Sequence, residues 1–327
     1  MFANNASGWS KGKRRTLIGT GLVLACAYAI GALLTDSARL SDALRQLGWL
    51  GCGAVLGLSA ANYLFRFLRW QHYIVRLGHR LPWLRHFLVY LSGFAFTVSP
   101  AKAGEAVRSL YLRDHGVTYT SSIAAFFVER LLDMFAMVIL ADLVIFDHPR
   151  YRPLLIATWV LLICVLICVC QSSLQRMLER FGTQRPGRIG KLVVAFANLL
   201  RSSRTLLHPQ PLFAGLIAGL LAWGAEAVGF YIICQSLHID GSISTFCGIY
   251  AVAVLGGTAA FFLPAGIGGM EVIMTTLLVE RGATLQVAII ATLLCRLATL
   301  WFAVLIGVGA ASAVELSEQP LTARAVQ

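Results

Sequence analysis

The chain has 327 residues, of which 58% are hydrophobic and only 13% are charged, and its formal net charge is +12. So little charge excludes a water-soluble globular protein of this length and predicts an all-α, polytopic membrane protein. The positive charge is typical of cytoplasmic loops and of contact with anionic lipid headgroups. We expect no nucleic-acid partner, because no basic and aromatic module is visible.

Six apolar segments have roughly the ~20 residues that a helix needs to cross a bilayer. In chain order they are 16–34, 48–70, 120–146, 153–171, 211–236 and 286–312. The first follows a polar, basic stretch, Met1 to Arg15, and has no clear cleavage site, so we interpret it as a span and not as a signal peptide.

Two further apolar runs do not fit this pattern. The run at 86–99 has fourteen residues and would cover about 21 Å as a helix, which is short of the ~30 Å hydrocarbon core. The run at 243–263 ends, like the first, at a Pro-Ala pair followed by glycines.

Charge predicts the orientation of these segments. Basic residues precede the first span, follow the second and fill 172–208, so these parts should be cytoplasmic. Both termini are then cytoplasmic. Successive spans can cross the membrane in alternate directions only if the runs at 86–99 and 243–263 each enter and leave on the same side of the membrane. We therefore predict two re-entrant hairpins, with returning arms at about 101–116 and 265–282.

The basic segment 172–208 has apolar residues at helical spacing. A helix on the cytoplasmic leaflet and a plain linker helix packed on the protein both fit this pattern.

An internal repeat relates residues 93–133 to 257–299. The offset is 164 up to Gly104 and 166 from Glu105 onward, and thirteen of the 41 positions of the first segment match. The matches include a proline, a glutamate, three glycines and a mid-span arginine in the same order. Apolar composition alone would not readily align these residue types.

Repeat and topology together predict two inverted copies, at about 48–146 and 211–312. The span 153–171 and the basic segment 172–208 link them within one transmembrane domain, 16–312, and the tail 313–327 is cytoplasmic. Inverted repeats with broken helices are typical of transporters, which bind substrate near the midplane.

Charged residues at membrane depth are the candidate translocation site. Arg130 and Arg296 lie about eleven residues into their spans, where an unpaired arginine costs at least about 2.5–3.5 kcal/mol. Asp133, Glu105 and Glu271 are candidate partners. They could form fixed ion pairs, a polar path for a charged headgroup, or both.

The hairpin tips contribute a second set of candidates: Pro100, Gly104, Pro264, Gly266 and Gly268. Proline ends a helix and glycine lets the chain reverse, so each returning arm begins with free N–H groups that attract an anion. Lys102 and Arg108 add positive charge to the first hairpin alone.

Other polar residues have simpler interpretations. We expect Arg66, Arg69 and Trp70 to anchor the second span at the interface, and His86 to be interfacial as well. The eight cysteines lie in apolar segments and predict neither a metal site nor disulfides. We expect no catalytic residues, metal or cofactor, and we find no phosphate loop for ATP.

The motifs "SPAKAGEAVRSLYLR", "ER-x2-D" and "LPAGIGGME" resemble the flippase-like family that includes the membrane region of lysylphosphatidylglycerol synthases. The resemblance covers nearly all of residues 10–312 and implies lipid transfer across the bacterial inner membrane. In the fused synthases this region is thought to move aminoacylated phosphatidylglycerol. The given chain ends at Gln327 without a catalytic domain, so we expect no lysyl-lipid synthesis by it.

The leading hypothesis is a flippase for an anionic or aminoacylated lipid, or for a lipid-linked precursor. The alternative is a small-solute or ion transporter with the same architecture. An intramembrane enzyme would need a catalytic constellation that we do not find. An assembly subunit without transport of its own also remains open, as does a lipid-synthesising enzyme partner. The lipid, the direction, the energy source and the oligomeric state do not follow from the sequence.

Overall fold

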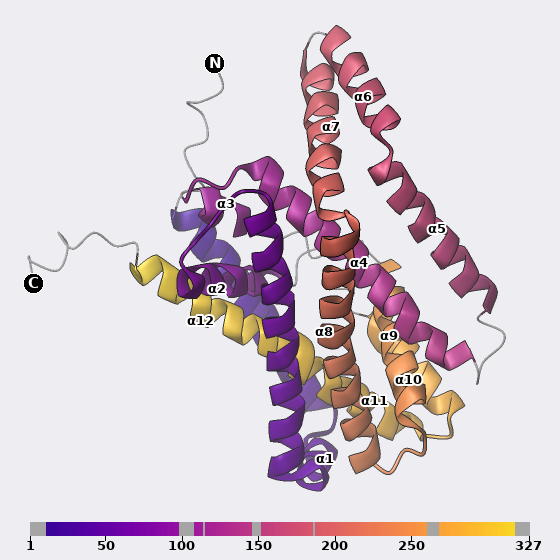
Figure 1. Ribbon diagram of the computed structural model, residues 1–327. Coiled ribbons are helices and arrows are strands. Elements are labelled where there is room, and N and C mark those ends of the chain that lie inside the picture. Colours follow the sequence, from indigo (N-terminus) through magenta and orange to yellow (C-terminus); the bar gives the residue numbers. More distant parts are fainter. Residues whose placement is uncertain are drawn as a thin grey trace, which may run out of the picture.

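The computed structural model describes residues 11–97, 108–113, 115–145, 152–185, 187–259 and 268–317, with the backbone alone for 11–37 and Ala259. The described part is all helical, without a strand (Figure 1). Its elements are α1 (Lys11–Arg76), α2 (Trp83–Ser92), η1 (Gly93–Phe96), α3 (Arg108–Arg113), α4 (Tyr119–Ile145), α5 (Arg152–Cys170), α6 (Ser172–Gln184), α7 (Arg188–Leu206), α8 (Pro209–Ser236), α9 (Ile243–Ala259), α10 (Gly269–Glu280), α11 (Leu285–Arg296), the π-helical η4 (Leu297–Trp301) and α12 (Phe302–Ser317).

Four helical stretches in the described part are long and apolar enough to cross a membrane: Ala38–Arg76, Arg152–Cys170, Pro209–Ser236 and Leu285–Ser317. The predicted span at 120–146 is also one helix, α4, but it carries Glu129, Arg130 and Asp133. Helix α12 continues to Ser317, five residues beyond the predicted end of the last span at residue 312.

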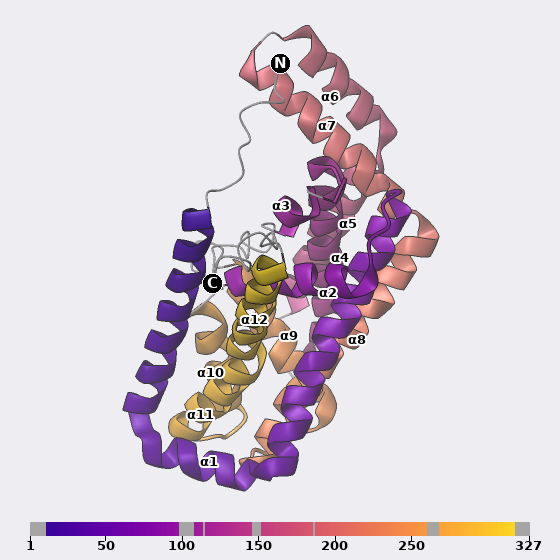
Figure 2. The same cartoon turned by 90° about the vertical axis from the view of Figure 1, so that its left-hand side faces the viewer.

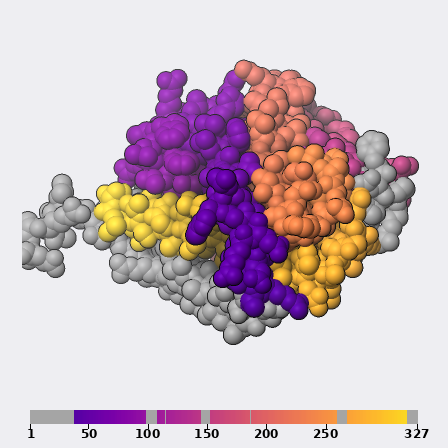
Figure 3. All heavy atoms as spheres, turned by 90° about the horizontal axis from the view of Figure 1, so that it is seen from below, coloured from indigo at the N-terminus to yellow at the C-terminus, as the bar shows by residue number. Residues whose placement is uncertain are grey.

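The first two predicted spans belong to one bent helix. A straight helix of 66 residues would measure about 100 Å, three times the hydrocarbon thickness. Instead α1 descends, crosses the lower end of the molecule and rises again (Figure 2). Gly48, with φ +66°, adopts a left-handed conformation within it. From below, the indigo part of α1 lies between the orange and yellow C-terminal segments (Figure 3).

The rising arm of α1 packs antiparallel on α8. Val55 lies against Gly229, the Asn62 amide donates to the Ala222 carbonyl at 2.9 Å, and Arg69 lies against Gly219. Residue numbers therefore rise along α1 as they fall along α8. Small residues on α8 let the two helices approach closely.

Each half of the chain packs a short helix on the last helix of the other half. Gly307 of α12 lies against the backbone of Phe94 and Ala95 in η1. Reciprocally, Gly248 of α9 lies against Val144 of α4. Within the second half, Gly257 faces Met270, and α9 and α10 lie side by side (Figure 1).

The basic segment 172–208 forms a hairpin of two helices, α6 and α7, and not a single helix. In Figure 1, α6 extends α5 upward and α7 returns toward α8, so the hairpin projects beyond the rest of the molecule. Gly182 and Gly190 meet in close backbone contact, and Arg201 pairs with Glu179 at 2.5 Å across the hairpin.

Candidate functional site

Charged side chains from three helices meet inside the protein. We call this group the arginine cluster, and its members are Arg66 and Arg69 of α1, Arg108 of α3, and Glu129, Arg130 and Asp133 of α4. Residues three and four apart on a helix share a face, so α1 and α4 each present their charges together.

Glu129 is the centre of this cluster and is fully buried. Its Oε2 accepts from Arg108 Nη2 at 2.5 Å. Its Oε1 accepts from the Tyr90 hydroxyl at 2.8 Å and from Arg130 at 3.1 Å, and Arg66 lies 3.5 Å away. One carboxylate therefore holds side chains from α1, α2, α3 and α4 together.

Asp133 completes the cluster one turn further along α4. Its Oδ1 accepts from Arg69 Nη2 at 2.6 Å, and its Oδ2 lies 3.0 Å from Arg130 Nη2. Four arginines thus share two carboxylates, so the cluster's own members carry a net charge of +2. Buried charge of this kind is costly unless it is compensated.

Arg108 is held by aromatic rings as well as by charge. Its guanidinium lies 3.7 Å from the Trp70 ring centroid and 4.7 Å from that of Tyr90. The Trp70 indole donates to His86 Nε2 at 2.9 Å, which fixes the ring. Arg108 is fully buried, yet its Nε and Nη1 have no hydrogen-bond partner among the residues that the structure describes. Two charged donors are therefore left unsatisfied within the described part of the protein.

The second half of the chain contains a smaller ion pair. Arg296 Nε donates to Glu271 Oε1 at 2.7 Å, and the Gly268 N–H donates to Glu271 Oε2 at 2.8 Å. Glu271 therefore binds the amino end of α10 and the end of α11 at once. The π-helical η4 starts directly after Arg296, and π-helical turns are frequent at functional sites.

Polar side chains continue between the two groups. Arg66 lies 5.6 Å from the Trp223 ring centroid. On the same helix as Trp223, Glu226 accepts from the Tyr250 hydroxyl at 2.5 Å. The Tyr63 hydroxyl donates to the Thr299 carbonyl at 3.1 Å, within η4. Helices α1 and α8 therefore carry a buried polar track from the arginine cluster toward Arg296.

Among the predicted site residues, Arg108, Arg130 and Asp133 lie in the arginine cluster, and Glu271 and Arg296 form the second pair. Gly268 precedes α10 with φ +93°. The other predicted residues lie outside the described part of the chain: Pro100, Lys102, Gly104, Glu105, Pro264 and Gly266.

The interfacial roles expected for Arg66, Arg69 and Trp70 are wrong. These residues are 5%, 3% and 0% exposed, because the two arginines bind the carboxylates of α4 and Trp70 packs against Arg108 and His86. His86 is likewise fully buried and contacts Trp70 and Gln71. The signal in the sequence was the i, i+3 pair of arginines, which, like the i, i+4 pair of Glu129 and Asp133, lies on one face of its helix. No group of three or more potential metal ligands occurs among the described residues.

Comparison with known proteins identifies the family of this chain. The family model of the lysylphosphatidylglycerol synthase transmembrane region matches residues 17–307. A UPF0104 membrane protein from Methanothermobacter thermautotrophicus is 25% identical over 325 residues, covering 92% of this chain and 95% of that protein. The matched region contains the bent helix, the arginine cluster and the second ion pair. The chain therefore belongs to the family of the lysylphosphatidylglycerol synthase transmembrane region.

Proposed function

We propose that this protein is a flippase, which moves a lipid with an anionic or aminoacylated headgroup across the bacterial inner membrane. The observation that carries the proposal is the arginine cluster, in which three buried arginines and the partly exposed Arg130 share two carboxylates, and Arg108 has two donors without partners among the described residues. A phosphate group fits such donors, because arginine binds it with parallel hydrogen bonds.

The packing of the two halves supports a transport mechanism. Antiparallel α1 and α8, and the reciprocal contacts of η1 with α12 and of α9 with α4, are what two inverted copies would produce. In transporters with inverted repeats, one copy rocks against the other around a central site. The polar track lies along this α1–α8 contact, where a headgroup would pass.

The short helices fit re-entrant hairpins in this mechanism. Helix α2 with η1, and helix α9, would enter from opposite sides and bring their tips to mid-membrane. The protein performs no chemical reaction in this scheme. The two carboxylates of α4 bind the arginines until the phosphate of the lipid takes the place of these carboxylates.

Transbilayer movement of labelled phosphatidylglycerol in proteoliposomes tests the proposal. Arg108→Gln should slow that movement about 10-fold or more, since a hydrogen bond to a charged group contributes about 1.5–3 kcal/mol. Arg45→Gln, which changes an exposed arginine on α1, should leave the rate unchanged. If Arg108→Gln moves lipid at the wild-type rate, the arginine cluster is not the headgroup site.

The same vesicles test the small-solute alternative. Uptake of inorganic phosphate without movement of labelled lipid would replace the flippase proposal with a solute transporter.

A further inference from the structure

The α6–α7 hairpin has a surface that lipid translocation does not use. Its exposed apolar side chains, which we call the hairpin surface, are Met177, Phe181, Ile189, Leu192 and Phe196. Ile189 and Leu192 are 63% and 69% exposed. Exposed apolar side chains gathered on one element are typical of an interaction site.

The hairpin surface lies beyond the ends of the two apolar spans that flank it. The apolar spans on either side end at Cys170 and begin at Pro209. Leu192 precedes Pro209 by 17 residues, which is about 25 Å of helix. The headgroup layer is only about 5–8 Å thick. Figure 1 shows α7 rising above the start of α8, and Figure 2 shows it inclined to α8, so the hairpin projects beyond the ends of the two spans.

The net charge of the hairpin indicates which class of partner can bind the hairpin surface. Residues 172–206 contain seven basic residues and one acidic residue, Glu179, so the hairpin has a net charge of +6. Glu179 is already paired with Arg201. A second copy of the hairpin would meet it with the same positive charge, which disfavours self-association through this surface.

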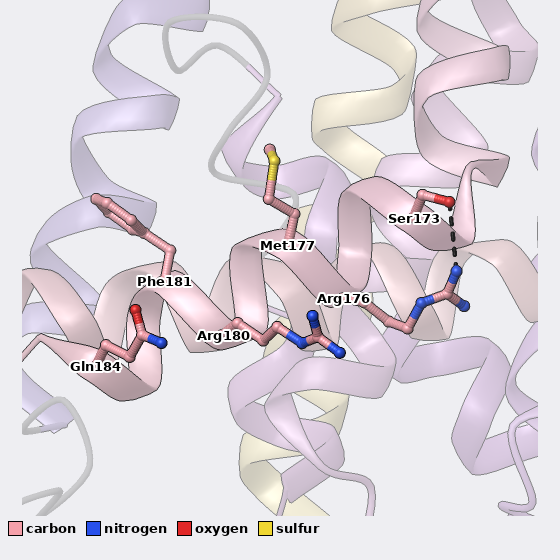
Figure 4. A pocket seen from close by; sticks show the side chains of 6 residues that line it. All are labelled: Ser173, Arg176, Met177, Arg180, Phe181 and Gln184. Atoms are coloured by element: carbon pink, nitrogen blue, oxygen red, sulfur yellow. Dashed lines mark hydrogen bonds between the residues drawn. The ribbon is translucent and has the colours of Figure 1, made fainter.

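The shape of α6 also fits a partner. Its outer face has a groove of about 520 Å³ lined by Ser173, Arg176, Met177, Arg180, Phe181 and Gln184. Figure 4 shows the apolar Met177 and Phe181 side chains on the same helix as the guanidinium groups of Arg176 and Arg180. Apolar anchors with flanking basic groups match an amphipathic helix whose polar face is acidic.

We propose that the α6–α7 hairpin is a docking arm for an acidic, amphipathic helix of a partner protein on the side of the membrane to which the hairpin projects. The apolar side chains of the hairpin surface bind the apolar stripe of that helix. Arg180, Arg185 and Arg188 bind its carboxylates. The arm would then bring a partner to the membrane side from which lipid enters or leaves, without contact between that partner and the arginine cluster.

The test uses the full-length protein in nanodiscs and a synthetic helix with glutamates on one face and leucines on the other. A control peptide has the same composition with its leucines scrambled. We expect the amphipathic peptide to bind at least about 10-fold more tightly than the control. Arg180→Glu combined with Arg188→Glu should weaken its binding about 10-fold or more.

A control variant with the same change in net charge is Arg39→Glu combined with Arg45→Glu. Both residues are exposed and belong to α1, whose bend lies at the opposite end of the molecule from the hairpin (Figure 2). It changes the net charge equally and should leave peptide binding unchanged. The proposal is overturned if neither peptide binds, if both bind equally, or if the two double variants weaken binding alike.

A photocrosslinker at Leu192 in nanodiscs with anionic lipid tests the membrane itself. Adducts with the peptide support the docking arm, whereas adducts with lipid in its presence would assign the hairpin surface to the bilayer. Binding is measured without transport, so failure of the docking arm and failure of the flippase proposal are separate results.

Discussion

At the scale of single residues, Glu129 is the side chain on which the interior depends most. It is fully buried and bonded to arginines from two other helices and to Tyr90. Replacing Glu129 leaves the arginines with Asp133 alone among the carboxylates of the cluster, whereas replacing one arginine leaves both carboxylates paired. The two kinds of substitution should therefore lower the free energy of unfolding by different amounts.

We expect Glu129→Gln to lower the free energy of unfolding by about 3–5 kcal/mol, the usual cost of breaking a buried ion pair. Arg108→Gln should cost less, because Glu129 keeps Arg66, Arg130 and Tyr90. Thermal unfolding of the two variants in the same detergent measures the difference. Equal midpoints would mean that Glu129 does not organise the cluster.

The Glu271–Arg296 pair permits a charge swap. Glu271→Arg and Arg296→Glu should each lower the unfolding midpoint. Each replaces a salt bridge, in which the charged atoms are 2.7 Å apart, with two like charges at the same place. The double variant should recover part of the loss, but not the bond from the Gly268 N–H, which an arginine cannot accept. A double variant as unstable as the sum of the two single ones would show that the ion pair itself contributes nothing.

At the scale of elements, close contact of glycines with the opposite half of the chain positions the helices. A methyl group at Gly307 would lie 2.6 Å from the Phe94 carbonyl carbon, and backbone cannot move aside as a side chain can. Gly309, two residues further along α12, has open space around it.

Gly307→Ala should therefore destabilise the protein by about 1–3 kcal/mol through overpacking. Gly309→Ala should be neutral or stabilising, by up to about 1 kcal/mol, because alanine favours a helix more than glycine does. Unfolding in increasing denaturant compares the two variants. If both behave alike, α12 does not pack on η1 as closely as described.

At the scale of the whole molecule, the distribution of charge and the arrangement of the helices indicate the same orientation in the membrane. The α6–α7 hairpin and the beginning of α1 lie at the same end of the molecule, and the bend of α1 lies at the other (Figure 2). Basic residues are abundant in the hairpin and before the first span. Positive segments remain on the cytoplasmic side during insertion, so the upper end in Figure 2 should be cytoplasmic.

Reporter fusions test this orientation. Green fluorescent protein should fluoresce when fused after Gln184, at the hairpin tip, and alkaline phosphatase should be active when fused after His148, between α4 and α5. The same reporter active at both positions would contradict a crossing by α5.

Much of this architecture could be predicted from the sequence, because apolar length and charge act locally along the chain. The 20-residue runs predicted helices at 153–171, 211–236 and 286–312, and the structure has α5, α8 and α11–α12 there. The matched prolines, glycines and arginines predicted a break in each half at residues outside the described part of the chain, and the short helices α2–η1 and α9 precede those residues. Membership of the family followed from the same motifs.

Tertiary structure alone decided which charges meet. Arg66 and Arg69 stand near the end of an apolar run, where sequence cannot distinguish a lipid anchor from a buried partner, because both keep the charge near polar groups. Their burial depends on α4 and α8, which are 60 to 150 residues away along the chain. The same holds for the projection of α6–α7: helical spacing predicted apolar faces, but only the packing of α6 on α7 determined which apolar side chains remain exposed.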